Sequence, residues 1–249
     1  MTGAPEPPQP REPTSPDEEL LEAETLVIAS QLSDEARVDR ITDELRRGFD
    51  ALAAVGRAVS IFGSARTPPD DPRYTQAREL ARRLGEEGFA ILTGGGPGIM
   101  EAANRGARDA GAASIGLGID LPEEQGMNEW VGLPLTFHYF FTRKVMFVRY
   151  ASAFVVCPGG FGTLDELFEA ATLRQTQKIR HFPIVLYDSA YWRGLTDWLR
   201  SPMEEEGMVS PGDVDLLELT DDPDYVIELV KDVEHRRPRR SEAAGETPG

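Results

Sequence analysis

Two segments of this 249-residue chain repeat one pattern, in which an apolar run leads into Gly-Gly-x-Gly and then into a helical stretch. The glycines of the first segment are Gly95, Gly96 and Gly98, and those of the second are Gly159, Gly160 and Gly162. Glycine permits a positive φ and lets backbone N–H groups approach a ligand, and the N-terminus of a helix attracts anions. We therefore interpret at least one of the two turns as a phosphate-binding loop. The alternative is that the glycines only form tight turns between a strand and a helix.

Apolar runs and helical stretches alternate along the central part of the chain. The strand-like runs are 59–62, 89–92, 114–117, 154–157 and 184–187, with 133–137 and 216–219 as further candidates. The helical patterns are 71–87, 99–110, 143–150, 163–177, 192–206 and 223–233. This alternation is typical of a parallel sheet that is covered by helices on both faces. We expect an α/β fold with a doubly wound, Rossmann-like sheet, in which ligands bind at the carboxyl ends of the strands.

The two ends of the chain differ from its centre. Residues 1–16 contain six prolines and almost no apolar side chain, so we expect a disordered tail there, and a second flexible tail over 235–249. Between 17 and 56, apolar residues recur at three- and four-residue spacing, which predicts an amphipathic helical extension. The remaining residues, 57–234, are predicted to form a single Rossmann-like domain.

Composition and missing motifs exclude several classes of function. The net charge of −17 disfavours binding to nucleic-acid polymers, which depends on Lys and Arg. Cys157 is the single cysteine and the three histidines are scattered, so we expect neither a disulfide nor a metal site. No apolar run approaches the roughly 20 residues of a membrane span, and we expect a cytoplasmic protein that does not bind membranes. Neither glycine turn has the spacing of a dinucleotide fingerprint or a P-loop, so no cofactor is expected.

A longer motif surrounds the second glycine turn. Residues 158–166 read P-G-G-F-G-T-L-D-E and resemble the P-G-G-x-G-T-x-x-E motif of the Lonely Guy (LOG) family, which are cytokinin-activating nucleoside 5′-monophosphate phosphoribohydrolases. Three other segments fit this family: 94–101 with its other glycine turn, Arg143-Lys144 and Met146 with R-K-x-x-M, and 61–66 with its first strand exit. Thr142 stands where plant-type members usually carry Glu, and the helical extension is additional. Both departures indicate the longer, bacterial-type branch.

The resemblance implies a reaction and an assembly. The reaction is hydrolysis of the N-glycosidic bond of AMP or a cytokinin riboside 5′-monophosphate, which gives the free base and ribose 5-phosphate without a cofactor. The assembly is a homodimer or a larger homo-oligomer. A non-enzymatic nucleotide sensor or carrier on the same fold remains the alternative. A pyridoxal-dependent lysine decarboxylase is disfavoured, because the glycine turns fit an anchored ribose phosphate better.

Glu166 and Arg143 are the predicted catalytic residues. We expect Glu166 in the first turn of a helix, where the dipole favours an ionised carboxylate that could stabilise a ribosyl cation or orient water. The alternative is structural, because Thr163 and Glu166 also have the spacing of a capping box. Arg143 is expected to contact the ribose, the base or the leaving nitrogen; its alternative is a solvated cationic face.

Further residues complete the predicted substrate site. Besides the six glycines, these are Ser64, Arg66, Glu101, Asn104, Lys144 and Thr163. We expect Glu101 and Asn104 to face the cleft and to hold the base or the ribose, and Ser64 and Arg66 to line the base or phosphate pocket. Helix-start chemistry for the first pair and a turn for the second are the alternatives.

Overall fold

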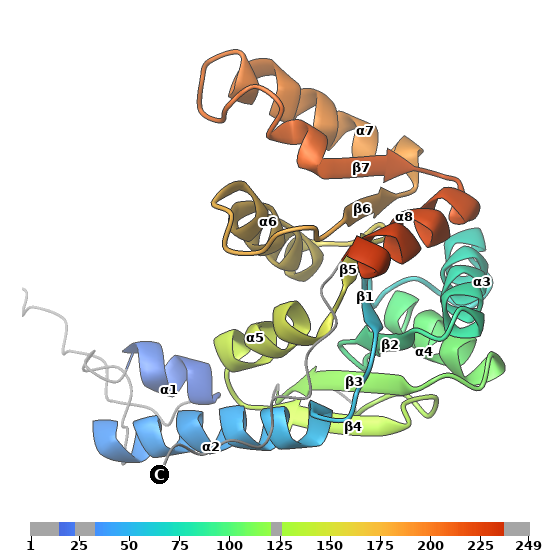
Figure 1. Cartoon of the computed structure of the whole chain (residues 1–249). Helices are drawn as coiled ribbons and strands as arrows, with labels where there is room; N and C mark the ends of the chain where they lie inside the picture. The colour runs from blue at the N-terminus through green and yellow to red at the C-terminus, as the bar shows by residue number, and fades with distance from the viewer. Residues whose placement is uncertain (1–14, 23–32, 121–125, 237–249) are drawn as a thin grey trace, which may run out of the picture.

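The structure is a computed structural model that describes residues 15–22, 33–120 and 126–236. Within these residues, seven parallel strands form one sheet in the order β4-β3-β2-β1-β5-β6-β7 (Figure 1). The strands are β1 (Ala58–Phe62), β2 (Ala90–Thr93), β3 (Ser114–Ile119), β4 (Leu133–Phe137), β5 (Ala153–Val156), β6 (Ile184–Tyr187) and β7 (Leu217–Thr220). Each predicted strand is present, and the predicted doubly wound α/β fold is confirmed.

The helices lie close to their predicted positions. They are α1 (Pro16–Glu22), α2 (Asp34–Leu52), α3 (Pro72–Glu86), α4 (Ile99–Asp109), α5 (Phe140–Tyr150), α6 (Phe161–Gln175), α7 (Ser189–Trp198) and α8 (Pro223–Arg236). The prediction of one regular helix over 192–206 is wrong, because Pro202 lacks an N–H group and the segment Leu199–Glu204 is irregular. A short 3₁₀ turn, Val214–Leu216, precedes β7.

The predicted tails are shorter than expected where the structure describes them. Pro16 begins α1, in the first helical position that proline favours, and α8 continues to Arg236. The rest of both predicted tails lies outside the described residues. Helices α1 and α2 fall in the segment that was predicted to be helical.

The sheet is buried on both faces, which is why its strands are almost continuously apolar. On one face, helices α3, α4 and α8 pack against Val59, Ile61, Ile91 and Val155 (Figure 1). On the other face, α5 and α6 pack against Phe62, Leu92, Phe154 and Val156. Successive strand residues point to opposite faces, and each strand therefore contributes to both halves of the core.

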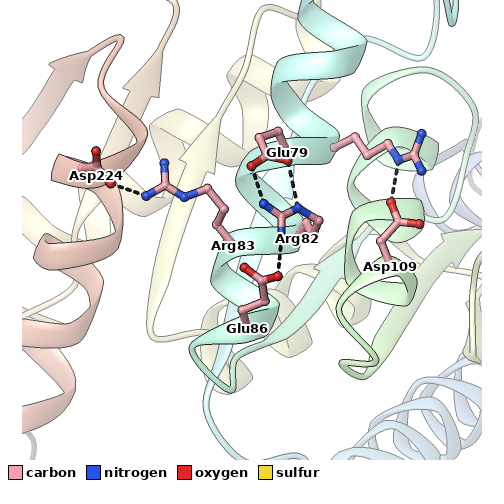
Figure 2. Close-up of polar contacts among 7 residues, drawn as sticks. Glu79, Arg82, Arg83, Glu86, Asp109 and Asp224 are labelled. Carbon is pink, nitrogen blue, oxygen red and sulfur yellow. Dashed lines mark hydrogen bonds and ion pairs between the residues drawn. The ribbon is translucent and has the colours of Figure 1, made fainter.

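Ion pairs connect α3 to its neighbours on the first of these faces. Figure 2 shows Arg83 of α3 paired with Asp224 of α8, and Arg82 bound by Glu79 and Glu86 on the same helix. Arg78 Nε lies 2.6 Å from Asp109 Oδ2 of α4. These side chains are partly exposed to solvent, and such pairs contribute only about 0–1 kcal/mol each. The predicted catalytic residues, Arg143 and Glu166, lie on α5 and α6, which cover the opposite face of the sheet. We therefore assign these ion pairs to structure and not to function.

The order in which strands are added to the sheet reverses between β1 and β5. From β1 it proceeds through β2 and β3 to β4 at one edge, and β5 then returns to pair with the other side of β1. Ligands of such sheets bind outside the carboxyl ends of the strands at this switch point. The loops that follow β1 and β5 meet there, because Ser64 N donates to Pro158 O at 2.9 Å.

The first glycine loop joins the same cluster of loops. Ile99 N donates to Ser64 O at 3.0 Å, and Gly98 has a φ of +69°. A Cβ atom on Gly98 would lie 2.4 Å from Ser64 O. Glycine is therefore required at this position for the two loops to approach each other, as the structural alternative for this glycine predicted.

Candidate functional site

The second glycine loop leaves its backbone open where α6 begins. The N-cap of α6 is Gly160, and no side chain caps this end. The first N–H groups of an α-helix have no acceptor within the helix. A Cβ atom on Gly160 or Gly162 would meet no atom within 4 Å, so the fold itself does not need glycine there. Gly159 differs, because its Cβ would lie 2.1 Å from Thr163 Oγ1.

The start of α6 excludes the capping box. The helix begins at Phe161, so Thr163 is its third residue and Glu166 lies in the second turn. A capping box needs the Thr at the N-cap position, where the structure has Gly160. The structural alternative for Glu166 is therefore wrong, as is the expectation that Glu166 lies in the first turn. Thr163 is buried and packs against Gly159.

Glu166 is a buried carboxyl group, and one of its two oxygens has no hydrogen-bond partner among the described residues. Its side chain is 3% exposed, and its Oε1 lies 3.4 Å from Arg143 Nη2. Its Oε2 is buried and has no hydrogen-bond partner among the described residues. Burial raises the pKa of Glu166 to about 7, although Arg143 and Lys144 act to lower it. The expectation that the site favours the ionised carboxylate is corrected, since burial shifts the pKa in the opposite direction. A group of this pKa can both donate and accept a proton at neutral pH.

Arg143 faces inward from the first turns of α5. Its side chain is 13% exposed, and its guanidinium lies 5.0 Å from the ring centre of Phe140 and 5.8 Å from that of Phe147. The alternative of a solvated cationic face is therefore wrong. The two rings hold the guanidinium from α5 itself, and its Nη2 reaches Glu166 on α6.

Lys144 has partners within the protein. Its Nζ lies 2.8 Å from Asp165 Oδ1 and 2.9 Å from Glu169 Oε2, both on α6. Neighbouring residues of α5 thus contact the same helix, and Lys144 adds positive charge near Glu166. The ammonium group that was predicted to bind substrate is already paired in this structure.

Asn104 does not face the cleft, which corrects its prediction. Its side chain is fully buried; Oδ1 accepts from Thr93 Oγ1 at 2.7 Å, and Nδ2 donates to Ser114 Oγ at 2.9 Å. Asn128 Nδ2 also donates to Asn104 Oδ1, and to Gly95 O and Gly96 O. The amide of Asn104 therefore belongs to a network that fixes the first glycine loop. Asn128 was missed because no motif marks it.

Glu101 points to α3. Its Oε1 accepts from the hydroxyl group of Tyr74 at 2.9 Å, and Tyr74 packs in the core on the α3 side of the sheet. Glu166 and Arg143 belong to helices on the other face. Among the described residues, Glu101 forms no ion pair with Arg143 and its partner is Tyr74.

Ser64 and Arg66 have different roles. Ser64 forms the turn after β1, since its Oγ accepts from Arg66 N at 3.0 Å and its backbone binds both neighbouring loops. Arg66 is exposed, and no described residue forms an ion pair with its guanidinium. Arg66 is therefore still a candidate for contact with an anion, whereas Ser64 positions the loops.

Tyr191 of α7 is a further contact that the motifs did not reveal. Its hydroxyl donates to Gly159 O at 2.7 Å and thereby ties the carbonyl of the glycine loop to α7. No sequence pattern links positions 159 and 191.

Among the described residues, no group of three or more His, Cys, Asp or Glu side chains could hold a metal ion. None of the described helices is both long and apolar enough to cross a bilayer.

Comparisons with known proteins agree with the motifs. Residues 100–230 match the family described as "Possible lysine decarboxylase". A protein of Oryza sativa subsp. japonica, named probable cytokinin riboside 5′-monophosphate phosphoribohydrolase LOGL5, is 31% identical over 160 residues. A protein of Rhodococcoides fascians, named cytokinin riboside 5′-monophosphate phosphoribohydrolase, is 25% identical over 62% of this chain and 79% of its own length.

The coverage of these similarities differs. The LOGL5 alignment takes in 62% of this chain, and the chain spans only 63% of LOGL5 and 64% of a second rice relative, LOGL3. The molybdenum cofactor carrier protein of Chlamydomonas reinhardtii has a TM-score of 0.53 at 22% identity, covers 72% of this chain and 99% of its own, and shows the fold alone. Since the family match covers more than half of the chain, the chain belongs to the LOG family, which carries the description of a possible lysine decarboxylase.

Proposed function

We propose that this protein hydrolyses the N-glycosidic bond of a nucleoside 5′-monophosphate, either AMP or a cytokinin riboside 5′-monophosphate. The observation that carries the proposal is the pair formed by Glu166 and Arg143 beside the open start of α6. The names of the curated relatives support the same chemistry. The products are the free base and ribose 5-phosphate.

The start of α6 is the proposed phosphate site. The N–H groups of residues 161–163 are free of helical acceptors, and the helix dipole attracts an anion to this end. The open space at Gly160 and Gly162 lets phosphate oxygens approach the backbone. Arg66 adds a positive charge from the loop after β1. Anchoring the 5′-phosphate here fixes the ribose relative to the catalytic pair.

The catalytic pair acts on the ribose and the leaving base. Cleavage of the glycosidic bond develops positive charge on the ribosyl group, as in glycoside hydrolysis. The ionised form of Glu166 stabilises this charge and accepts the proton of the water that attacks C1′. The electron pair of the broken C–N bond leaves with the base, where the Arg143 guanidinium stabilises it. The base nitrogen then takes up a proton, which balances the proton that Glu166 removes from water, and the free base is the product. The unpartnered Oε2 of Glu166 is the oxygen available to ribose or water.

The proposal is tested by incubating the purified protein with AMP, GMP, CMP and isopentenyl-AMP. We expect base and ribose 5-phosphate in equal amounts from at least one of the adenine nucleotides. Binding of every nucleotide without product would instead support the alternative of a carrier, the role named for the Chlamydomonas neighbour. The absence of both binding and turnover would contradict both functions.

Replacing Gly162 by Ala separates phosphate binding from folding. Gly162 is the second residue of α6, its φ is not positive and its Cβ position is open, so Ala fits the fold and favours the helix by about 0.4–1 kcal/mol. The added methyl group occupies the space of the phosphate. We expect an unchanged or higher melting temperature together with about a tenfold higher KM for AMP. An unchanged KM would place the phosphate elsewhere.

We further propose a cytosolic homodimer. Phe141 and Val145 on α5 and Phe168 on α6 are large apolar side chains that are 43%, 41% and 38% exposed. The ion pairs of Lys144 bring these helices together, so the three side chains belong to neighbouring surfaces. A second copy of the chain would remove them from water.

A further inference from the structure

The helix that carries Arg143 begins without a cap of its own. The N-cap of α5 is Tyr139, whose side chain makes no capping hydrogen bond. Arg143 is the fourth residue of the helix, and a cation near the N-terminus opposes the helix dipole. The missing cap and the nearby cation both destabilise the first turn of α5, although the proposed site needs Arg143 in a fixed position there.

Helix α2 supplies the missing acceptor. The side chain of Glu44 is fully buried, and its Oε1 accepts from the backbone N of His138 at 2.7 Å and lies 2.5 Å from His138 Nδ1. Its Oε2 accepts from Thr142 Oγ1 at 2.7 Å. Both carboxyl oxygens of Glu44 thus hold the segment in which α5 begins, and Thr142 directly precedes Arg143 in the chain.

Helix α1 adds a second acceptor at the same place. The backbone N of Phe140, the first residue of α5, donates to Asp17 Oδ2 at 3.3 Å. Figure 1 shows α1 and α2 lying beside α5. The first turn of α5 is therefore capped by carboxyl groups from two helices that precede β1. Negative charge at this end also offsets the unfavourable interaction of Arg143 with the dipole.

We propose that Glu44 is a positioning residue for the site, because it holds the first turn of α5 and thereby fixes Arg143 against Glu166. Glu44 acts through Thr142 and His138 and does not touch the substrate. The inference rests on the proposed function in so far as Arg143 and Glu166 carry out the chemistry. It gives the helical extension a role in the site.

The test replaces Glu44 by Gln in the full chain and follows the carboxyl group of Glu166 by ¹³C NMR titration, with its signal assigned by comparison with a Glu166→Gln sample. The groups that act on Glu166 are Arg143 and Lys144 of α5, and Asp165 and Glu169 of α6. If Arg143 moves away, its lowering effect is lost, and the pKa of Glu166 rises by about one unit. Loss of the negative charge of Glu44 alone would shift this pKa in the opposite direction. The sign of the shift therefore distinguishes positioning from simple electrostatics.

Turnover provides the second readout. We expect kcat for AMP to fall about tenfold in Glu44→Gln with a smaller change in KM, since misplacement of a catalytic group affects the transition state most. Asp43→Asn is the matched control, because it removes the same charge from the adjacent, exposed position of α2. We expect this control to leave both the pKa of Glu166 and kcat unchanged.

A third variant covers the case in which Glu44→Gln does not fold. Thr142→Val keeps the shape of the side chain and the net charge but removes the hydroxyl that reaches Glu44. It is expected to raise the pKa of Glu166 in the same direction. An unchanged or lower pKa in the folded variants would overturn the inference, even if the melting temperature falls. If wild-type protein turns over no mononucleotide, the proposed function fails and the titration still decides the role of Glu44.

Discussion

Replacing Glu166 by Gln is expected to lower kcat for AMP by about 100- to 10,000-fold, the range for loss of a general acid or base. Gln cannot accept the proton of the attacking water, nor can it carry the negative charge that stabilises the ribosyl cation. The variant should still bind AMP, because the phosphate site lies at the start of α6 and does not involve this side chain. The effect therefore falls on kcat more than on KM.

The same substitution is expected to stabilise the protein at neutral and higher pH. The pKa of Glu166 rises from an ordinary value of 4.5 to about 7 on folding, so the folded state binds this proton more tightly than the unfolded state. The resulting stability is present below pH 4.5 and is lost as the pH rises to about 7. For a shift of this size, the free energy of unfolding falls by about 3 kcal/mol across that window. Gln does not titrate, and the variant lacks this loss.

Both effects are measured on one preparation. Steady-state assays with AMP give kcat and KM, and urea unfolding at pH 5 and pH 8 gives the free energy of unfolding of wild type and variant. Asp43→Asn is the control, because it removes an exposed carboxyl group on α2 that is not among the groups acting on Glu166. Wild-type turnover in Glu166→Gln would show that the group has no catalytic role. A variant that is less stable at pH 8 would contradict the assigned pKa.

The fold could be predicted because its signal is local. Each strand is a short apolar run and each helix has its own periodicity, so the succession of strands and helices along the chain could be predicted from the sequence. The order of the strands within the sheet was not predicted. The first residues of the helices were predicted less accurately. Gly162 suggested a loop but belongs to α6, because the first turn of a helix has no internal acceptors to lose and tolerates a glycine.

The site could be predicted only where a motif marks it. The motifs identified Glu166 and Arg143, which the structure brings to 3.4 Å. The direction of the pKa shift of Glu166 was predicted wrongly, because burial raises this pKa and depends on the packing of α5 and α6, which the sequence does not reveal. Asn104 was misassigned and the contact of Glu101 with Tyr74 was missed, for a related reason. Their positions after a glycine turn are visible in the sequence, but the partners that engage them, Ser114 and Tyr74, come from other elements.

Replacing Arg143 by Ala is the second substitution with a large expected effect. The guanidinium lies 3.4 Å from Glu166 and acts to lower the pKa of that carboxyl group. Its loss removes the group that stabilises the leaving base, and removal of one such donor typically costs about 100- to 1,000-fold in kcat. It also raises the pKa of Glu166 further, so that less of the carboxyl group is ionised at pH 7. The pH at which kcat reaches half of its plateau should therefore move upward.

Stability separates this catalytic role from a structural one. In Arg143→Ala the buried Glu166 avoids an unpaired charge by staying protonated, so the melting temperature at pH 6 should change little. Arg149→Ala is the matched control, because Arg149 lies on the same helix and its guanidinium is 4.9 Å from the ring centre of Phe49, a contact of the same kind without Glu166. Arg143→Lys keeps the charge but loses the planar fork and should recover only part of kcat. If Arg143→Ala and Arg149→Ala lose equal activity and equal stability, packing on aromatic rings accounts for both, and Arg143 has no role in the chemistry.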